Sequence, residues 1–65
     1  MIADEESERL CRAIDDLPEK LRLVVVLSAI DGHSVRDVSL LLSIPEGTVK
    51  SRLFDARKRL QEMLQ

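Results

Sequence analysis

The sequence predicts an all-α fold, a small four-helix domain that ends in a helix-turn-helix without a wing. No segment shows the sustained polar and apolar alternation of a β-strand, whereas apolar residues recur at helical spacing. Pro18, Gly32 and Pro45 divide the chain into helix-length segments. Because a chain of 65 residues buries only a small core, we expect residues 1–65 to form a single domain.

The first helix is expected over about residues 3–15. Its apolar residues recur at helical spacing and share one face: Leu10, Ala13, Ile14 and Leu17. Cys11 is expected to be a half-buried helix residue. A single cysteine and a single histidine exclude an intramolecular disulfide and a zinc site built from these residues, so no metal is expected. The same counts fit a reducing cytoplasm, where we expect the protein to reside.

A second helix is expected over about residues 18–31. Pro18 suits its first turn, where the missing N–H is not needed, and Gly32 suits the position just past its end. The segment is apolar on nearly all sides, which predicts that it is the central helix of the domain. Its longest apolar run, residues 23–27, is far too short to span a bilayer, so no membrane partner is expected.

A short third helix is expected over residues 34–42. Ser34 and Asp37 have the spacing of a capping box, in which the serine hydroxyl accepts a hydrogen bond from the first turn. Residues 43–44 leave room only for a tight turn before the next helix starts.

The fourth helix is expected over about residues 45–63, since Pro45 and Glu46 favour a helix start. Two helices joined by a turn of a few residues, the second one basic, are typical of a helix-turn-helix. On a helical wheel, the apolar residues of the fourth helix form one narrow stripe that must face the core: Val49, Leu53, Ala56, Leu60 and Met63 or Leu64.

The opposite face of the fourth helix carries side chains suited to reading a nucleic acid. Lys50 can donate to guanine O6 or N7, Ser51 to several acceptors, and Phe54 can pack on a thymine methyl. Gly47 lacks a side chain where the helix end must approach DNA closely. Thr48 and the free N–H groups of the first turn could hold a phosphate.

The distribution of charge also indicates an interaction surface at the C-terminal end. Residues 1–19 hold seven acidic and two basic residues, for a net charge of −5, and residues 50–65 hold two acidic and five basic ones, for +3. A nucleic acid backbone is the simplest partner for such an end. A solvated helix face would explain Lys58 and its neighbours equally well, and Phe54 could instead cover a gap between helices or mark a protein contact.

An enzyme is not expected from this sequence. The acidic residues fall on predicted helix surfaces, and no nucleophile, base and orienting group converge in the chain. We therefore expect no catalytic residue, no cofactor and no small-molecule substrate.

The residues discussed above form a specific pattern. LPEKLRLVVVL, followed by DGHSVRDVSLLLSIPEGTVKSRLFDARKRLQ, closely resembles region 4 of bacterial sigma factors of the extracytoplasmic-function type. The most specific part is IPEGTVKSRL with ARKRL downstream, and the resemblance covers roughly residues 10–64. It implies a domain that reads the −35 promoter element in the major groove and directs RNA polymerase to start transcription. It also implies docking on the β flap of RNA polymerase core and masking by an anti-sigma factor.

The resemblance assigns roles to individual residues. Lys50, Ser51 and Phe54 fall on base-contacting positions. Other residues fall near phosphates or on the DNA-facing side of the fourth helix: Ser34, Arg36, Gly47, Thr48, Arg52 and Lys58.

Three residues depart from the family pattern. Asp55 stands where the family often has a basic residue; it could accept from cytosine N4 or pair with basic residues of the same helix, of which the pairing is favoured. Ser28 stands where the second helix often offers an arginine. Ser43 replaces a glycine in the turn and, if left-handed there, costs roughly 1 kcal/mol.

Other functions stay open at this point. The −5 segment, Ser28 and Asp55 would also suit a protein-interaction module that binds the polymerase flap or an anti-sigma factor. The output domain of a response regulator shares the TVK-type recognition helix. Because 65 residues cannot supply the region that melts the −10 element, we expect an excised domain rather than a stand-alone regulator.

Overall fold

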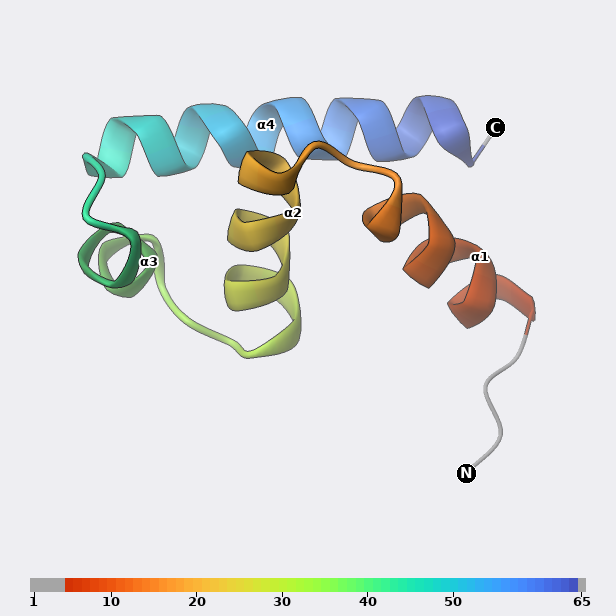
Figure 1. The fold of residues 1–65 in the computed structure, drawn as a ribbon, viewed down its shortest axis with the longest axis horizontal. Helices are drawn as coiled ribbons and strands as arrows, with labels where there is room; N and C mark the ends of the chain where they lie inside the picture. The colour runs from red at the N-terminus through yellow and green to blue at the C-terminus, as the bar shows by residue number, and fades with distance from the viewer. Residues whose placement is uncertain (1–4, 65) are drawn as a thin grey trace.

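Four α-helices build the fold in the computed structural model, which describes residues 5–64 (Figure 1). The helices are α1 (Glu5–Asp15), α2 (Glu19–Val25), α3 (Val35–Leu42) and α4 (Glu46–Met63), and a π-helical turn, η1 (Val26–Ile30), extends α2. No β-strand occurs within residues 5–64, and the predicted all-α, four-helix class is confirmed. Residues 3–4 of the expected first helix lie outside the described residues.

The longest helix, α4, organises the arrangement of the other three. Figure 1 shows α2 crossing the middle of α4, with α3 at the N-terminal end of α4 and α1 towards its C-terminal end. The most extensive contact between helices joins α2 and α4, as the apolar composition of the second helix predicts. None of the helices between residues 5 and 64 is long and apolar enough to cross a membrane.

The core consists of two apolar clusters on either side of α2. One cluster joins α1, α2 and α4 through Ile14, Leu17, Leu21, Val25 and Ala56. The other joins α2, α3 and α4 through Val24, Val38 and Val49, which have no exposed surface. Leu53 packs against both clusters, so a single side chain of α4 links the two halves of the core.

The structure corrects one expectation about burial and leaves several apolar side chains of the first two helices exposed. Cys11 is exposed, not half-buried, because it points away from the face of α1 that carries Ala13 and Ile14. Leu10 lies on that face but is also exposed. The second helix is not covered on all sides, since Leu23 is exposed and Ile30 keeps 63% of its surface in solvent.

The second helix also ends differently from the continuous helix expected over 18–31. Its last residues widen into η1, where the N–H of Asp31 donates to the carbonyl of Val26 at 3.0 Å. The N–H of His33 reaches the carbonyl of Leu27 at 2.9 Å. Gly32 makes this closure possible because its φ of 78° lies in the left-handed region that glycine adopts without strain. Gly32 therefore ends the helix as the sequence predicts.

The turn between α3 and α4 sets the direction in which α4 leaves the core. Ser43 adopts φ 56° and ψ 44°, the left-handed conformation that the sequence analysis considered for this position. The N–H of Ile44 donates to the carbonyl of Ser39 at 3.1 Å, and the Ser39 hydroxyl donates back to the carbonyl of Ile44. Ile44 then packs against the cluster that contains Val38. These contacts hold the turn closed around an unfavourable backbone conformation.

Candidate nucleic-acid interface

The core-facing stripe of α4 determines which of its side chains face outward. Val49 and Ala56 are completely buried, and Leu53 and Leu60 pack against the core clusters, so the predicted stripe is confirmed over these residues. The sequence left Met63 and Leu64 open as the last residue of the stripe. Leu64 is half-buried and Met63 is exposed, so Leu64 is that residue. The remaining side of α4 is therefore free to meet a partner.

The three candidate base-reading side chains lie on this outward side. Lys50 and Ser51 are exposed, and Phe54 keeps 70% of its surface in solvent. The alternative in which Phe54 covers a gap between helices is therefore wrong. An aromatic ring this exposed contributes little to the core and remains available for an intermolecular contact.

The N-terminal end of α4 is open. Pro45 provides no side-chain cap, and the N–H of Thr48 donates to the carbonyl of Pro45 at 3.0 Å. Of the first-turn groups expected to be free, Thr48 N–H is thus already paired, whereas the N–H groups of Glu46 and Gly47 have no partner among residues 5–64. A Cβ built on Gly47 meets nothing within 4 Å, so packing inside the domain does not require glycine there.

A groove runs along one flank of α4. It has a volume of about 460 Å³ and lies between α4 and the start of α2; its lining is Pro18, Lys20, Leu21, Gly47, Thr48, Ser51, Arg52, Asp55 and Arg59. Four of the predicted site residues thus share one concave surface: Gly47, Thr48, Ser51 and Arg52. Lys20 was not among the candidates, because only the crossing of α2 over α4 brings it there.

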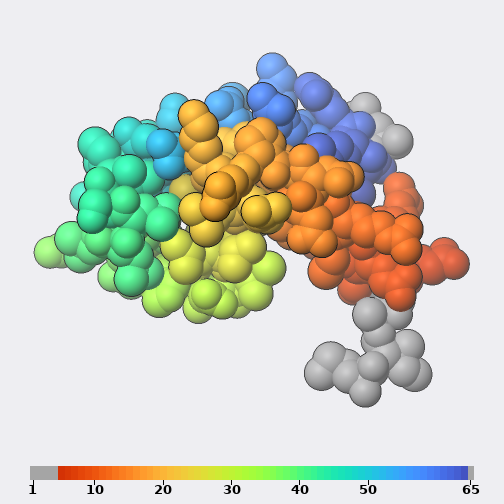
Figure 2. Space-filling model, viewed as in Figure 1, coloured from red at the N-terminus to blue at the C-terminus, as the bar shows by residue number. Residues whose placement is uncertain are grey.

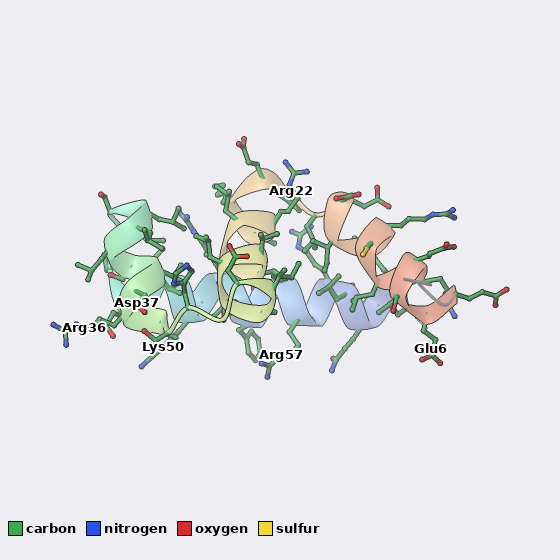
Figure 3. The ribbon with its side chains drawn as sticks, turned by 90° about the horizontal axis from the view of Figure 1, so that it is seen from below. Glu6, Arg22, Arg36, Asp37, Lys50 and Arg57 are labelled. Carbon is green, nitrogen blue, oxygen red and sulfur yellow. The ribbon has the colours of Figure 1, made fainter. Side chains whose placement is uncertain are left out.

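The other predicted residues lie outside this groove. Lys58 borders a smaller hollow with Asp55, Arg59 and Glu62. Figure 3 shows Arg36 extending from α3 at one end of the molecule, and Lys50 and Arg57 along one edge of α4. The outward side of α4 therefore has two flanks, one with the groove and one with Lys50 and Phe54.

Ser34 has the local role that its spacing predicts. It is the N-cap of α3, and its Oγ accepts a hydrogen bond of 3.1 Å from the N–H of Asp37. Both Ser34 and Arg36 are exposed at the start of α3. The cap satisfies one backbone donor, while the Ser34 hydroxyl proton can still be donated to an anion.

The acidic first turn of α1 lies apart from the first turns of α4. In Figure 2, α1 occupies one end of the molecule, and α3 with the first turns of α4 occupies the other. The first turn of α1 carries Glu5, Glu6 and Glu8. Within the described residues, no basic side chain of α4 makes an ion pair or hydrogen bond, whereas Arg9 and Arg22 donate to backbone carbonyls. The cations of α4 are thus available to an external anion.

Asp55 lies among these cations. It is exposed and lines the groove together with Arg52 and Arg59, but its carboxylate forms no hydrogen bond or ion pair within residues 5–64. The intrahelical pairing favoured from the sequence is therefore not present in this structure.

Comparison with known proteins agrees with this geometry. The family model described as Sigma-70, region 4 matches residues 7–60. Over 65 residues the chain is 35% identical to the ECF RNA polymerase sigma-E factors of Escherichia coli (strain K12) and Salmonella typhimurium (strain LT2), and 37% identical to the RNA polymerase sigma-H factor of Pseudomonas aeruginosa. These matches cover 100% of this chain and 34% of each relative, so the chain spans about a third of the length of these curated relatives. The chain therefore belongs to the sigma-70 region 4 family.

Proposed function

We propose that this domain recognises the −35 element of promoters and so directs RNA polymerase to start transcription. The observation that carries the proposal is the division of α4 into a buried stripe and an exposed, basic outward side that carries Lys50, Ser51 and Phe54. A helix held in this way can enter the major groove with its N-terminal turns against the base edges. Membership of the sigma-70 region 4 family supports promoter DNA over other nucleic acids.

The proposed roles follow from side-chain chemistry and position. Lys50 donates to guanine O6 or N7, Ser51 donates to or accepts from a base edge, and Phe54 packs on a thymine methyl. The open N–H groups at Glu46 and Gly47 receive a phosphate at the positive end of the helix dipole. Further phosphate contacts come from exposed or half-buried residues at the start of α3 and along α4: Ser34, Arg36, Thr48, Arg52 and Lys58.

We further propose that the domain docks on RNA polymerase core at the β flap and is masked by an anti-sigma factor. Exposed apolar side chains support a protein contact in addition to the DNA contact: Leu40 and Leu41 on α3 keep 69% and 57% of their surfaces in solvent. The family match favours this sigma-type role over the output domain of a response regulator. A cytoplasmic location follows from the proposed partners.

The function is tested by comparing two lysine variants on the same DNA. Lys50→Ala is expected to weaken binding to a −35 duplex by about 1–3 kcal/mol and to leave binding to scrambled DNA nearly unchanged. Lys58→Ala, the matched control, is expected to weaken binding to both duplexes alike. It should also make the slope of the logarithm of the binding constant against the logarithm of the salt concentration shallower by about 1, the loss of one phosphate contact. Backbone amide shifts in NMR titrations locate the contacted residues.

A different outcome of these two experiments would contradict the proposed function. Shifts that are identical for promoter and scrambled DNA, together with equal losses for both lysine variants, would rule out α4 as a sequence reader. The apolar surface of α3 would then be tested against the polymerase flap.

A further inference from the structure

The carboxylate of Asp55 is the feature of α4 that contacts with the phosphate backbone of DNA do not explain. Asp55 is exposed on the outward side of the helix and lines the groove that also contains Ser51. Ser51 and Asp55 are four residues apart, so the carboxylate lies one turn, about 6 Å, further along the same face. An acid in this position repels phosphates, and binding of the DNA backbone alone would be stronger without it.

Nearby cations allow the acid to approach DNA. Arg52 and Arg59 line the groove with Asp55, and Lys20 faces it from α2. These three positive charges outnumber the single negative one, so the groove as a whole still attracts phosphate. Pairs between Asp55 and the arginines at helical spacing would be weak and screened by salt, and none is formed in the structure. The carboxylate is therefore free to accept hydrogen bonds from a ligand.

The donors and acceptors in the major groove limit which bases a carboxylate can bind. An ionised carboxylate only accepts hydrogen bonds. Guanine presents N7 and O6 and thymine presents O4, all acceptors that repel it, whereas cytosine presents the N4 amino donor. Adenine offers an amino donor beside the acceptor N7, which makes it the poorer match. Adenine N6 lies between two acceptors, its own N7 and thymine O4, whereas cytosine N4 has only the O6 of the paired guanine beside it, so cytosine is the better match for Asp55.

We propose that Asp55 is a specificity-determining residue that selects cytosine at one position of the DNA site. This inference rests on the proposed function, because it requires α4 to lie in the major groove. The 6 Å between Ser51 and Asp55 corresponds to between one and two base-pair steps of about 3.4 Å, so the selected base lies next to, or one further than, the base read by Ser51. Asp55 lowers affinity for DNA in general and raises discrimination between sequences.

The test measures binding of the 65-residue chain to duplexes in which each position of the site carries each of the four base pairs in turn. The wild-type chain is expected to prefer cytosine at one position by about tenfold. Asp55→Asn should shift the preference at that position to adenine, since an amide pairs with adenine N6 and N7. Asp55→Ala should remove the preference there and strengthen binding to scrambled DNA.

Glu62→Gln is the matched control. Glu62 is an exposed acid on the outward side of α4, seven residues from Asp55, and borders a hollow with it. This change also removes one negative charge, but it should leave base preferences unaltered. Because both acids are exposed, circular dichroism should show the same fold for all variants.

The possible failures are distinguishable. If the wild-type chain discriminates between sequences but the Asp55 variants change binding to all duplexes by one common factor, Asp55 only modulates charge and the inference is overturned. If the wild-type chain binds every duplex equally, the proposed function itself fails, and this inference fails with it.

Discussion

Replacing Ser43 by glycine should stabilise the domain, and the structure allows the size of the effect to be worked out. Ser43 has φ 56° and ψ 44°, a conformation that costs a residue with a Cβ about 1–2 kcal/mol and costs glycine nothing. Glycine also has a larger conformational entropy in the unfolded chain, which lowers the stability of the folded domain by about 0.4–1 kcal/mol and opposes the relief of strain. With the middle of each range, about 1.5 and about 0.7 kcal/mol, the net expectation for Ser43→Gly is about 0.8 kcal/mol of added stability.

Thermal and urea unfolding, followed by circular dichroism, measure this change. For a domain of this size the expected gain raises Tm by about 2–8 °C, with the urea m-value unchanged. Ser51→Gly is the matched control, because it makes the same chemical change at an exposed position inside α4. There glycine should destabilise the domain by about 0.5 kcal/mol through its poorer helix propensity.

The two variants should change the free energy of unfolding in opposite directions, and this difference in sign tests whether Ser43 is strained. If Ser43→Gly were neutral or destabilising while Ser51→Gly behaved as expected, Ser43 would not be strained in solution. The turn between α3 and α4 would then have a different conformation from the one described here.

Further expectations concern the cap of α3, the exposed ring of α4 and the salt dependence of binding. Ser34→Ala should lower stability by about 1 kcal/mol, because the N–H of Asp37 loses its acceptor, and Ser34→Asp should restore most of it; urea unfolding tests both. Phe54→Ala should change stability by less than about 0.5 kcal/mol, since the ring is exposed, yet weaken binding to a duplex with a thymine at the contacted position; unchanged DNA binding would exclude the ring as a contact. Four cations are proposed to face DNA: Arg36, Lys50, Arg52 and Lys58. The logarithm of the DNA-binding constant should therefore fall with the logarithm of the salt concentration with a slope of about −3.6. A slope near zero would contradict binding to the DNA phosphates.

The acid-rich start of the chain bears on how the domain meets DNA. The acids of the first turn of α1, Glu5, Glu6 and Glu8, lie at the opposite end of the molecule from α3 and the first turns of α4 (Figure 2). Exposed charges separated by more than about 10 Å are largely screened at moderate salt. These three acids therefore do not oppose DNA binding at the first turns of α4.

Features that depend on local physical rules could be predicted from the amino-acid sequence. The four helices, the cap at Ser34, the stop at Gly32 and the stripe through Val49 and Ala56 all follow from spacing within a few residues. Resemblance in the IPEGTVKSRL segment also identified the family before any geometry was known. The DNA contacts assigned from that resemblance remain a prediction.

Features that depend on elements far apart in the chain became visible only in the folded domain. Apolar composition could not show that Leu23 and Ile30 stay exposed, because burial depends on which faces of α2 meet α3 and α4. Nor could a helical wheel place Lys20 in the groove of α4, since that contact spans about thirty residues of sequence. The absence of a partner for Asp55 within residues 5–64 likewise depends on side-chain positions that spacing does not determine. Local rules fix the helices, whereas the surface they jointly present is set by how they cross.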